Sequence, residues 1–273
     1  MPETVLKRLH YACFCGHVST ARLLLENTAD LNAVNKFGQI PLHTAALGGH
    51  KEIVLTLINE YHCDPNTKNI EGPSLLRYAI DSGNIDLIDT LISKFSSCSH
   101  SLSNEMFECF KHATLCGNED VVRLLTTKYN CLVDRQIRDD STPLHLAAMN
   151  GHKGVVMLLI NEFNWNPDPS LLYYACIGGN TELVDKLISE VKLDPSSVDN
   201  NRFNSLHFAA LSSQGEVVQL LATKYKCPVN TQAKNNDTPI HLAALKGHMG
   251  VVNILINEYN CNPEDRGPDG QTL

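Results

Sequence analysis

The chain has 273 residues, of which 43% are hydrophobic and 19% charged, and its formal net charge is −8. This composition is typical of a folded protein and too apolar for a disordered one, and the length exceeds that of one ordinary globular core. The acidic balance argues against non-specific binding to nucleic acid or to an anionic membrane, because both require a basic surface.

One short phrase recurs from the beginning of the chain to its end. Its clearest copies lie at 40–45, 142–147 and 238–243, and each contains Pro, an apolar residue, His and Ala in that order. Including weaker copies, the phrase ends at Ala12, Ala45, Ala79, Ala113, Ala147, Ala175, Ala209 and Ala243. Successive alanines are 33, 34, 34, 34, 28, 34 and 34 residues apart, and four residues after each comes a glycine or, once, Ser213. A fixed period near 33 residues predicts a solenoid.

Each repeat predicts two short helices followed by a turn. In the fifth, Thr142 is suited to cap a helix and Pro143 to the first helical position, where the missing amide hydrogen costs nothing. Gly151 then ends this helix, and a second helix with apolar residues at helical spacing covers 155–159. Helices of this length are marginal alone, so each pair must be stabilised by the pairs beside it.

The order Thr-Pro-Leu-His-x-Ala, Gly-His, apolar helix and Asp-x-Asn resembles the ankyrin repeat over nearly the whole chain. Tetratricopeptide repeats have about the same length, so the residues within the period decide between the two. The resemblance implies an all-α solenoid of stacked helix-turn-helix units with projecting β-hairpin or loop fingers. We expect one domain over 1–273, with repeats near 1–34, 35–68, 69–102, 103–136, 137–166, 167–198, 199–232 and 233–266, and the start of a ninth at 267–273.

The repeat departs from its pattern in three places. The interval from Ala147 to Ala175 is only 28 residues, which predicts a lost finger and a bend near 166–170. The fourth repeat lacks the phrase, and the polar stretch 96–101 before it predicts an irregular loop. Residues 269–273 open a ninth repeat with no polar closing repeat after it, so we expect a longer protein, with a mispredicted gene end as the alternative.

No stretch approaches the roughly 18 apolar residues needed to cross a bilayer, and the run 155–160 is typical of the longest. The first residues lack the apolar core of a signal peptide. Ten cysteines spread through such a chain indicate reduced thiols rather than a disulfide framework. We therefore expect a cytoplasmic protein, with the nucleus as the alternative, and no direct membrane insertion.

Histidines and cysteines also follow the repeat, which favours structural roles. One repeated position, in the first helix, holds His10, His43, His145, His207 and His241. A second position, directly after the glycine, holds His17, His50, His152 and His248. The resemblance implies that the first slot hydrogen-bonds the neighbouring backbone and the capping threonine. One further slot holds Cys63, Cys131, Cys227 and Cys261 but also Ala29, Trp165 and Leu193, as expected of an apolar packing position. The segment 13–17 is only faintly similar to a zinc site, and Cys13 matches Ala46 and Ala148. We expect no metal, no cofactor and no catalysis.

In the ankyrin family, partners are usually held by the finger tips and the exposed side of the first helix. The matching helix position reads Phe14, Leu47, Asp81, Leu115, Met149, Ile177, Leu211 and Leu245. This stripe is either packed between first helices or exposed for a partner. At the tips the candidates are Lys36, Phe37, Gln39, Glu71, Arg138, Asp139, Arg202, Phe203, Lys234 and Asn235, with Phe37, Arg202 and Phe203 as first choices.

The resulting functional prediction is a non-catalytic scaffold that binds another protein through the finger tips and the concave groove, as the recognition module of a larger intracellular protein. One alternative is a regulatory cytoplasmic module of a membrane protein or an enzyme whose effector domain lies outside this chain. Another alternative is a nucleotide-binding ankyrin module, which the acidic balance disfavours. We expect no nucleic-acid partner.

Overall fold

The computed structural model describes residues 3–67, 74–95, 101–131 and 141–262. The chain divides into two compact units, unit 1 over 1–133 and unit 2 over 134–273. Within the described ranges every regular element is one of sixteen helices, and no strand occurs. The predicted all-α repeat architecture is therefore confirmed, and in these ranges the fingers are loops and turns rather than paired strands.

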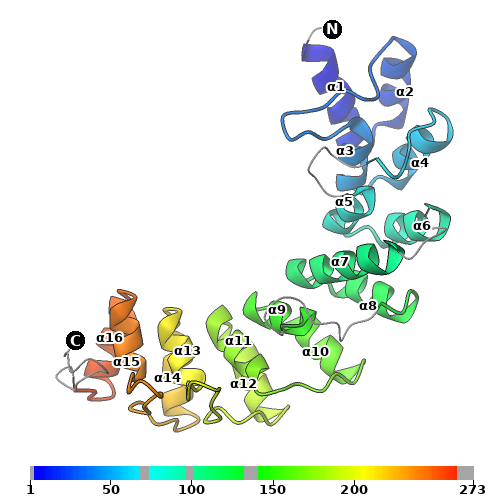
Figure 1. Cartoon of the computed structure of the whole chain (residues 1–273). Helices are drawn as coiled ribbons and strands as arrows, with labels where there is room; N and C mark the ends of the chain where they lie inside the picture. The colour runs from blue at the N-terminus through cyan, green and yellow to red at the C-terminus, as the bar shows by residue number, and fades with distance from the viewer. Residues whose placement is uncertain (1–2, 68–73, 96–100, 132–140, 263–273) are drawn as a thin grey trace. The chain divides into compact units, whose positions relative to one another are not determined.

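In its described residues, unit 1 contains four helix pairs that follow one another in Figure 1. Its helices are α1 Glu3–Phe14, α2 Val18–Glu26, α3 Pro41–Leu47, α4 Lys51–Asn59, α5 Leu75–Ser82, α6 Ile85–Phe95, α7 Ser101–Cys116 and α8 Glu119–Thr127. The first helices of successive pairs pack in order, α1 on α3, α3 on α5 and α5 on α7, while α2 contacts α4 and α6 contacts α8. Neighbouring pairs thus support one another, as the repeat requires.

Unit 2 is built in the same way, with four further helix pairs within residues 141–262. Its helices are α9 Pro143–Met149, α10 Lys153–Asn161, α11 Ser170–Gly178, α12 Thr181–Ser189, α13 Ser205–Leu211, α14 Gly215–Thr223, α15 Pro239–Leu245 and α16 Met249–Asn257. Here α9 packs on α11, α11 on α13 and α13 on α15, and α12 and α16 both contact α14. None of the helices in the described part of the chain is long and apolar enough to span a bilayer.

The recurring alanine is explained by the packing of the first helices. Ala45, Ala79 and Ala113 in unit 1 are completely buried, as are Ala147, Ala175, Ala209 and Ala243 in unit 2. A methyl side chain at this position lets adjacent first helices approach closely, and any larger side chain would overpack the contact.

The histidine of the first slot caps its own helix and reaches the next finger. In repeat five a capping box pairs Thr142 with His145, whose Nδ1 accepts from the Thr142 backbone N–H at 3.0 Å and lies 2.9 Å from the Thr142 hydroxyl. His43 and His207 accept in the same way from Ile40 and Asn204. Because Nδ1 is an acceptor, Nε2 carries the proton, and that of His43 donates to the Thr67 carbonyl at 3.0 Å. The structural role predicted for this slot is confirmed for these histidines.

The side chain directly after the glycine hydrogen-bonds the helix pair that precedes its own. His50 Nε2 donates to the carbonyl of Phe14 at 2.9 Å, and His248 Nε2 donates to that of Leu211 at 3.0 Å. Gln214 occupies the same slot and donates to the carbonyl of Ile177 at 3.0 Å. These bonds satisfy carbonyls at the C-terminal ends of the first helices, which have no partner within the helix.

The second helices of neighbouring pairs are joined by a similar contact in each unit. In unit 2, Asp185 of α12 accepts hydrogen bonds from the Lys224 ammonium and from the Tyr225 hydroxyl at 2.6 Å. These two donors hold the pKa of the Asp185 carboxyl below its usual value. In unit 1, Asp89 of α6 is bound in the same way by Lys128 and Tyr129.

Two of the irregular segments take definite forms. The connection between α10 and α11 covers only 162–169, whereas 190–204 connects α12 and α13, so the predicted loss of a finger is confirmed. The expected loop at 96–101 needs a correction at its end, since Ser101 already belongs to α7 and 96–100 lie outside the described residues. Helix α7 is 16 residues long, because it begins at Ser101, ahead of the degenerate phrase, and contains neither proline nor glycine to interrupt it.

Candidate functional site

The first finger of unit 1 is a tight turn held by the side chain of Asn35. The Asn35 carboxamide oxygen accepts from the backbone N–H groups of Phe37 at 2.9 Å and Gln39 at 3.0 Å, and its Nδ2 donates to Gln39 Oε1. The turn is closed by a 2.9 Å bond from the Asn35 N–H to the Gln39 carbonyl, with Gly38 at φ +72°. The tip residues Lys36 and Phe37 are therefore presented by a fixed backbone.

Helix α1 fixes this finger from the side. His10 Nε2 lies 2.9 Å from the Gln39 carbonyl, so the imidazole hydrogen-bonds the base of the finger. Both residues are buried, at 8% and 9% exposure. Gln39, a predicted tip residue, thus contributes to the inner support of the finger, and Lys36 and Phe37 form its exposed part.

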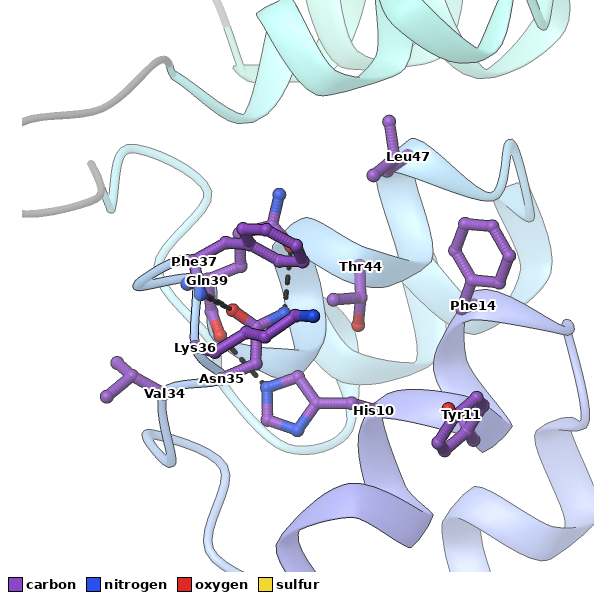
Figure 2. A pocket seen from close by; sticks show the side chains of 10 residues that line it. All are labelled: His10, Tyr11, Phe14, Val34, Asn35, Lys36, Phe37, Gln39, Thr44 and Leu47. Carbon is purple, nitrogen blue, oxygen red and sulfur yellow. Dashed lines mark hydrogen bonds between the residues drawn. The ribbon is translucent and has the colours of Figure 1, made fainter.

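A groove of about 750 Å³ lies between this finger and the first helices. We call it the α1–α3 groove, and Figure 2 shows its lining by His10, Tyr11, Phe14, Val34, Asn35, Lys36, Phe37, Gln39, Thr44 and Leu47. Four of these are strongly exposed apolar residues: Tyr11 at 69%, Phe14 at 48%, Val34 at 52% and Phe37 at 66%. Such a concentration of exposed apolar surface around a concavity is typical of a binding site.

The groove also carries a positive charge at its finger. The Lys36 ammonium lies 4.8 Å from the centre of the Phe37 ring, within the range of a cation–π contact. The same side chain is exposed to solvent and can approach a carboxylate of a bound molecule. The groove therefore offers aromatic surface and one cation next to each other, although the chain as a whole is acidic.

The predicted apolar stripe is partly exposed and partly packed. Phe14, Met149 and Leu245 are exposed, at 48%, 37% and 76%. The side chains of Leu47, Leu115, Ile177 and Leu211 are half-buried. The two interpretations left open by the sequence thus each apply to part of the stripe.

The remaining predicted tip residues lie on separate fingers of unit 2 or outside the described residues. Arg202, Lys234 and Asn235 are exposed, and Arg202 has φ +63° in the slot that Gly38 fills in the first finger. Phe203 is half-buried because its ring stacks on His207, with centroids 5.2 Å apart, and meets Phe208 edge-on. Glu71, Arg138 and Asp139 fall outside the described residues.

One cluster in unit 2 contains the residue types of a hydrolytic triad but not its geometry. His145 Nε2 lies 2.9 Å from the Ser170 hydroxyl and 3.4 Å from Asp168 Oδ1, while Ser170 also donates to Asp168. A triad needs the carboxylate on the opposite ring nitrogen from the serine, and here that nitrogen pairs with Thr142. In repeat two the equivalent His43 binds the Thr67 carbonyl of the finger. Asp168 and Ser170 take the place of that carbonyl as partners of His145.

The buried thiols fit packing positions. Cys131, Cys227 and Cys261 of the shared slot are 7%, 5% and 2% exposed, and Cys13 is fully buried. Burial raises the pKa of Cys13 to about 12 and those of Cys131 and Cys227 to about 11. The thiols of Cys13, Cys131 and Cys227 are therefore protonated near neutral pH, in keeping with the predicted apolar role.

Sequence reasoning missed Tyr11 and Val34 as parts of the groove. Tyr11 directly precedes the repeated alanine, at a position that also holds Tyr78, Tyr174 and Phe208. Comparison of exposure at that position distinguishes them, since Tyr78 is 5% exposed and Tyr11 69%. A search of the sequence for aromatic residues at this slot would have included Tyr11, but no sequence signal indicates the exposure of Val34.

Comparisons with known proteins agree with the helix pairs. The family model for ankyrin repeats in three copies matches residues 9–104, 76–170, 110–199, 144–233 and 206–272. The chain is 40% identical over 52 residues to the human (Homo sapiens) Notch-regulated ankyrin repeat-containing protein, covering 19% of this chain and 46% of that protein. It is 48% identical over 50 residues to E3 ubiquitin-protein ligase XBAT33 of Arabidopsis thaliana, covering 18% of this chain and 10% of that protein.

A third relative is osteoclast-stimulating factor 1 of Danio rerio, 33% identical over 64 residues, which are 23% of this chain and 30% of the relative. The chain thus matches less than half the length of each of these relatives. The family model, in contrast, covers nearly all of it. From the matched ranges and the stacked helix pairs, this chain belongs to the ankyrin repeat family.

Proposed function

We propose that the chain is a non-catalytic scaffold that binds another protein through the α1–α3 groove. Ankyrin repeats are generally protein–protein interaction modules. The observation that carries the proposal is the concentration of Tyr11, Phe14, Val34 and Phe37 around one concavity. These are four of the nine strongly exposed large apolar residues in the part of the chain that the structure describes. A monomeric surface rarely collects apolar side chains in this way without a partner.

The chemistry of the groove restricts the partner. A segment that supplies one aromatic or aliphatic side chain would bury it against Phe14, Tyr11 and Phe37. A carboxylate next to that side chain would meet the Lys36 ammonium, which the Phe37 ring already positions. We therefore expect a protein segment with an apolar anchor beside an acidic residue. The finger needs little ordering on binding, because Asn35 already fixes its backbone.

The test is selection of peptides from a random library on the full chain, followed by affinity measurements on the selected sequences. Apolar anchors flanked by Asp or Glu should be enriched. Phe37→Ala should weaken binding about fivefold or more, as expected for loss of more than about 1 kcal/mol at an interface anchor. Lys36→Glu should reverse the preference for acidic flanks.

Leu23→Ala is the matched control, because Leu23 of α2 is 60% exposed and does not line the groove. The affinity of the control for the selected peptides should equal that of the wild-type chain. The groove would be excluded as the binding site if Phe37→Ala and Leu23→Ala weakened binding equally. It would also be excluded if neither Phe37→Ala nor Tyr11→Ala changed the affinity for the selected peptides.

A further inference from the structure

Three side chains of different chemistry meet on the first helices of unit 1, outside the groove lining. Asp81 lies in the last turn of α5, and His112 and Cys116 lie one turn apart on α7. One ligand atom from each residue lies within 4.8 Å of the other two. His112 Nε2 is hydrogen-bonded to the Asp81 carboxylate and lies 3.6 Å from Cys116 Sγ.

The repeat itself does not require these residues. At the position of Asp81 the other seven repeats carry only apolar side chains, and Asp81 is the single charged member of the stripe. At the position of His112 the other repeats carry aromatic, aliphatic or threonine side chains, so His112 is the single imidazole. A carboxylate and an imidazole that both depart from the pattern, and that lie side by side next to a thiol, indicate a local role.

The donor set is that of a zinc ion. Zinc prefers a tetrahedral set of thiolate, imidazole and carboxylate, with Zn–S near 2.3 Å and Zn–N near 2.0–2.1 Å. Those bond lengths place tetrahedral ligand atoms about 3.5 Å apart, and the 3.6 Å between Cys116 Sγ and His112 Nε2 already satisfies this. The spacing of four residues on α7 keeps both side chains on one face of the helix.

We propose that Asp81, His112 and Cys116 bind a Zn²⁺ ion through Oδ1, Nε2 and Sγ, with water in the fourth position. Binding opens the Asp81–His112 hydrogen bond. The imidazole proton moves from Nε2 to Nδ1 through the solvent, so that Nε2 and Asp81 Oδ1 both turn lone pairs toward the metal. The Cys116 thiol gives its proton to the solvent as the Zn–S bond forms. The side chains of Asp81 and His112 are 31% and 13% exposed, so the site is accessible from solvent yet shielded on the side of His112.

The test uses Co²⁺ as a spectroscopic substitute for Zn²⁺ on the full reduced chain. Co²⁺ should give a thiolate charge-transfer band and tetrahedral d–d bands that saturate at one ion per chain, and Zn²⁺ should displace it. Cys116→Ser should abolish the charge-transfer band, and His112→Gln or Asp81→Asn should weaken binding about tenfold or more. Zn²⁺ should raise the melting temperature of the wild-type chain and leave that of Cys116→Ser unchanged.

Cys15→Ser is the matched control, because Cys15 is exposed and occupies in repeat one the slot that Cys116 occupies in repeat four. Its band and affinity should match those of the wild-type chain. Absence of a thiolate band in the wild-type chain, or equal loss of the band in Cys15→Ser and Cys116→Ser, would overturn the proposal. Circular dichroism of each variant confirms that the fold is retained.

Discussion

Replacing Gly179 by alanine tests the contact between neighbouring helix pairs directly. Gly179 is the C-cap of α11 with φ +77°, a left-handed conformation in which a Cβ costs about 1–2 kcal/mol. An added Cβ would also lie 2.2 Å from Gln214 Oε1, so the Gln214 side chain must move away. It would then lose its hydrogen bond to the Ile177 carbonyl, a loss of about 1 kcal/mol. The expected decrease in the free energy of unfolding is therefore about 2–3 kcal/mol.

Gly247→Ala is the control, because Gly247 has φ +73° and nothing within 4 Å of an added Cβ. Urea denaturation followed by circular dichroism should show a decrease in the free energy of unfolding of about 1–2 kcal/mol for this variant, because no hydrogen bond is lost. Combining Gly179→Ala with Gln214→Ala should bring the cost at residue 179 down to the same level, because the clash and the hydrogen bond are then both absent. Equal costs for Gly179→Ala in both backgrounds would refute the assigned role of Gln214.

Two further changes of stability follow from the fold. Ser213 has φ +63° in the glycine slot, so Ser213→Gly should stabilise the chain by about 1 kcal/mol in the same urea assay; a loss of stability would contradict this. Burial lowers the pKa of His207, and likewise that of His43, below the usual 6.5. The unfolded chain therefore binds more protons than the folded chain. The free energy of unfolding should keep its full value above pH 6.5 and decrease as the pH falls toward the folded pKa values. His207→Gln with His43→Gln should flatten that decrease.

The phrase and its spacing predicted most of the fold, because each repeated residue serves a contact that recurs. The alanine permits close helix packing, the glycine ends the first helix, and His10 and His43 support the neighbouring finger. The 28-residue interval also indicated the short connection 162–169. Local signals were sufficient for these features, because their partners lie at fixed offsets within the period.

The sites depend on residues that only the tertiary structure brings together. Phe203 was expected to lie exposed at a finger tip, yet its ring stacks on His207. Asp81 and His112 are 31 residues apart, and nothing in either repeat alone indicates that their side chains meet. The exposure of Tyr11 depends on its place in the first helix pair, whereas the equivalent Tyr78 is covered and packs near His43. The sequence therefore did not predict contacts between side chains of different repeats.

The most direct test of a binding role for the α1–α3 groove is crosslinking from a photoreactive residue at position 37, compared with the same residue at position 23. Both positions are exposed, at 66% and 60%, and only Phe37 lines the groove. With a peptide selected on the wild-type chain, crosslinking should occur from position 37 and be lost when unlabelled peptide competes. Crosslinking of equal yield from both positions would contradict the proposed site.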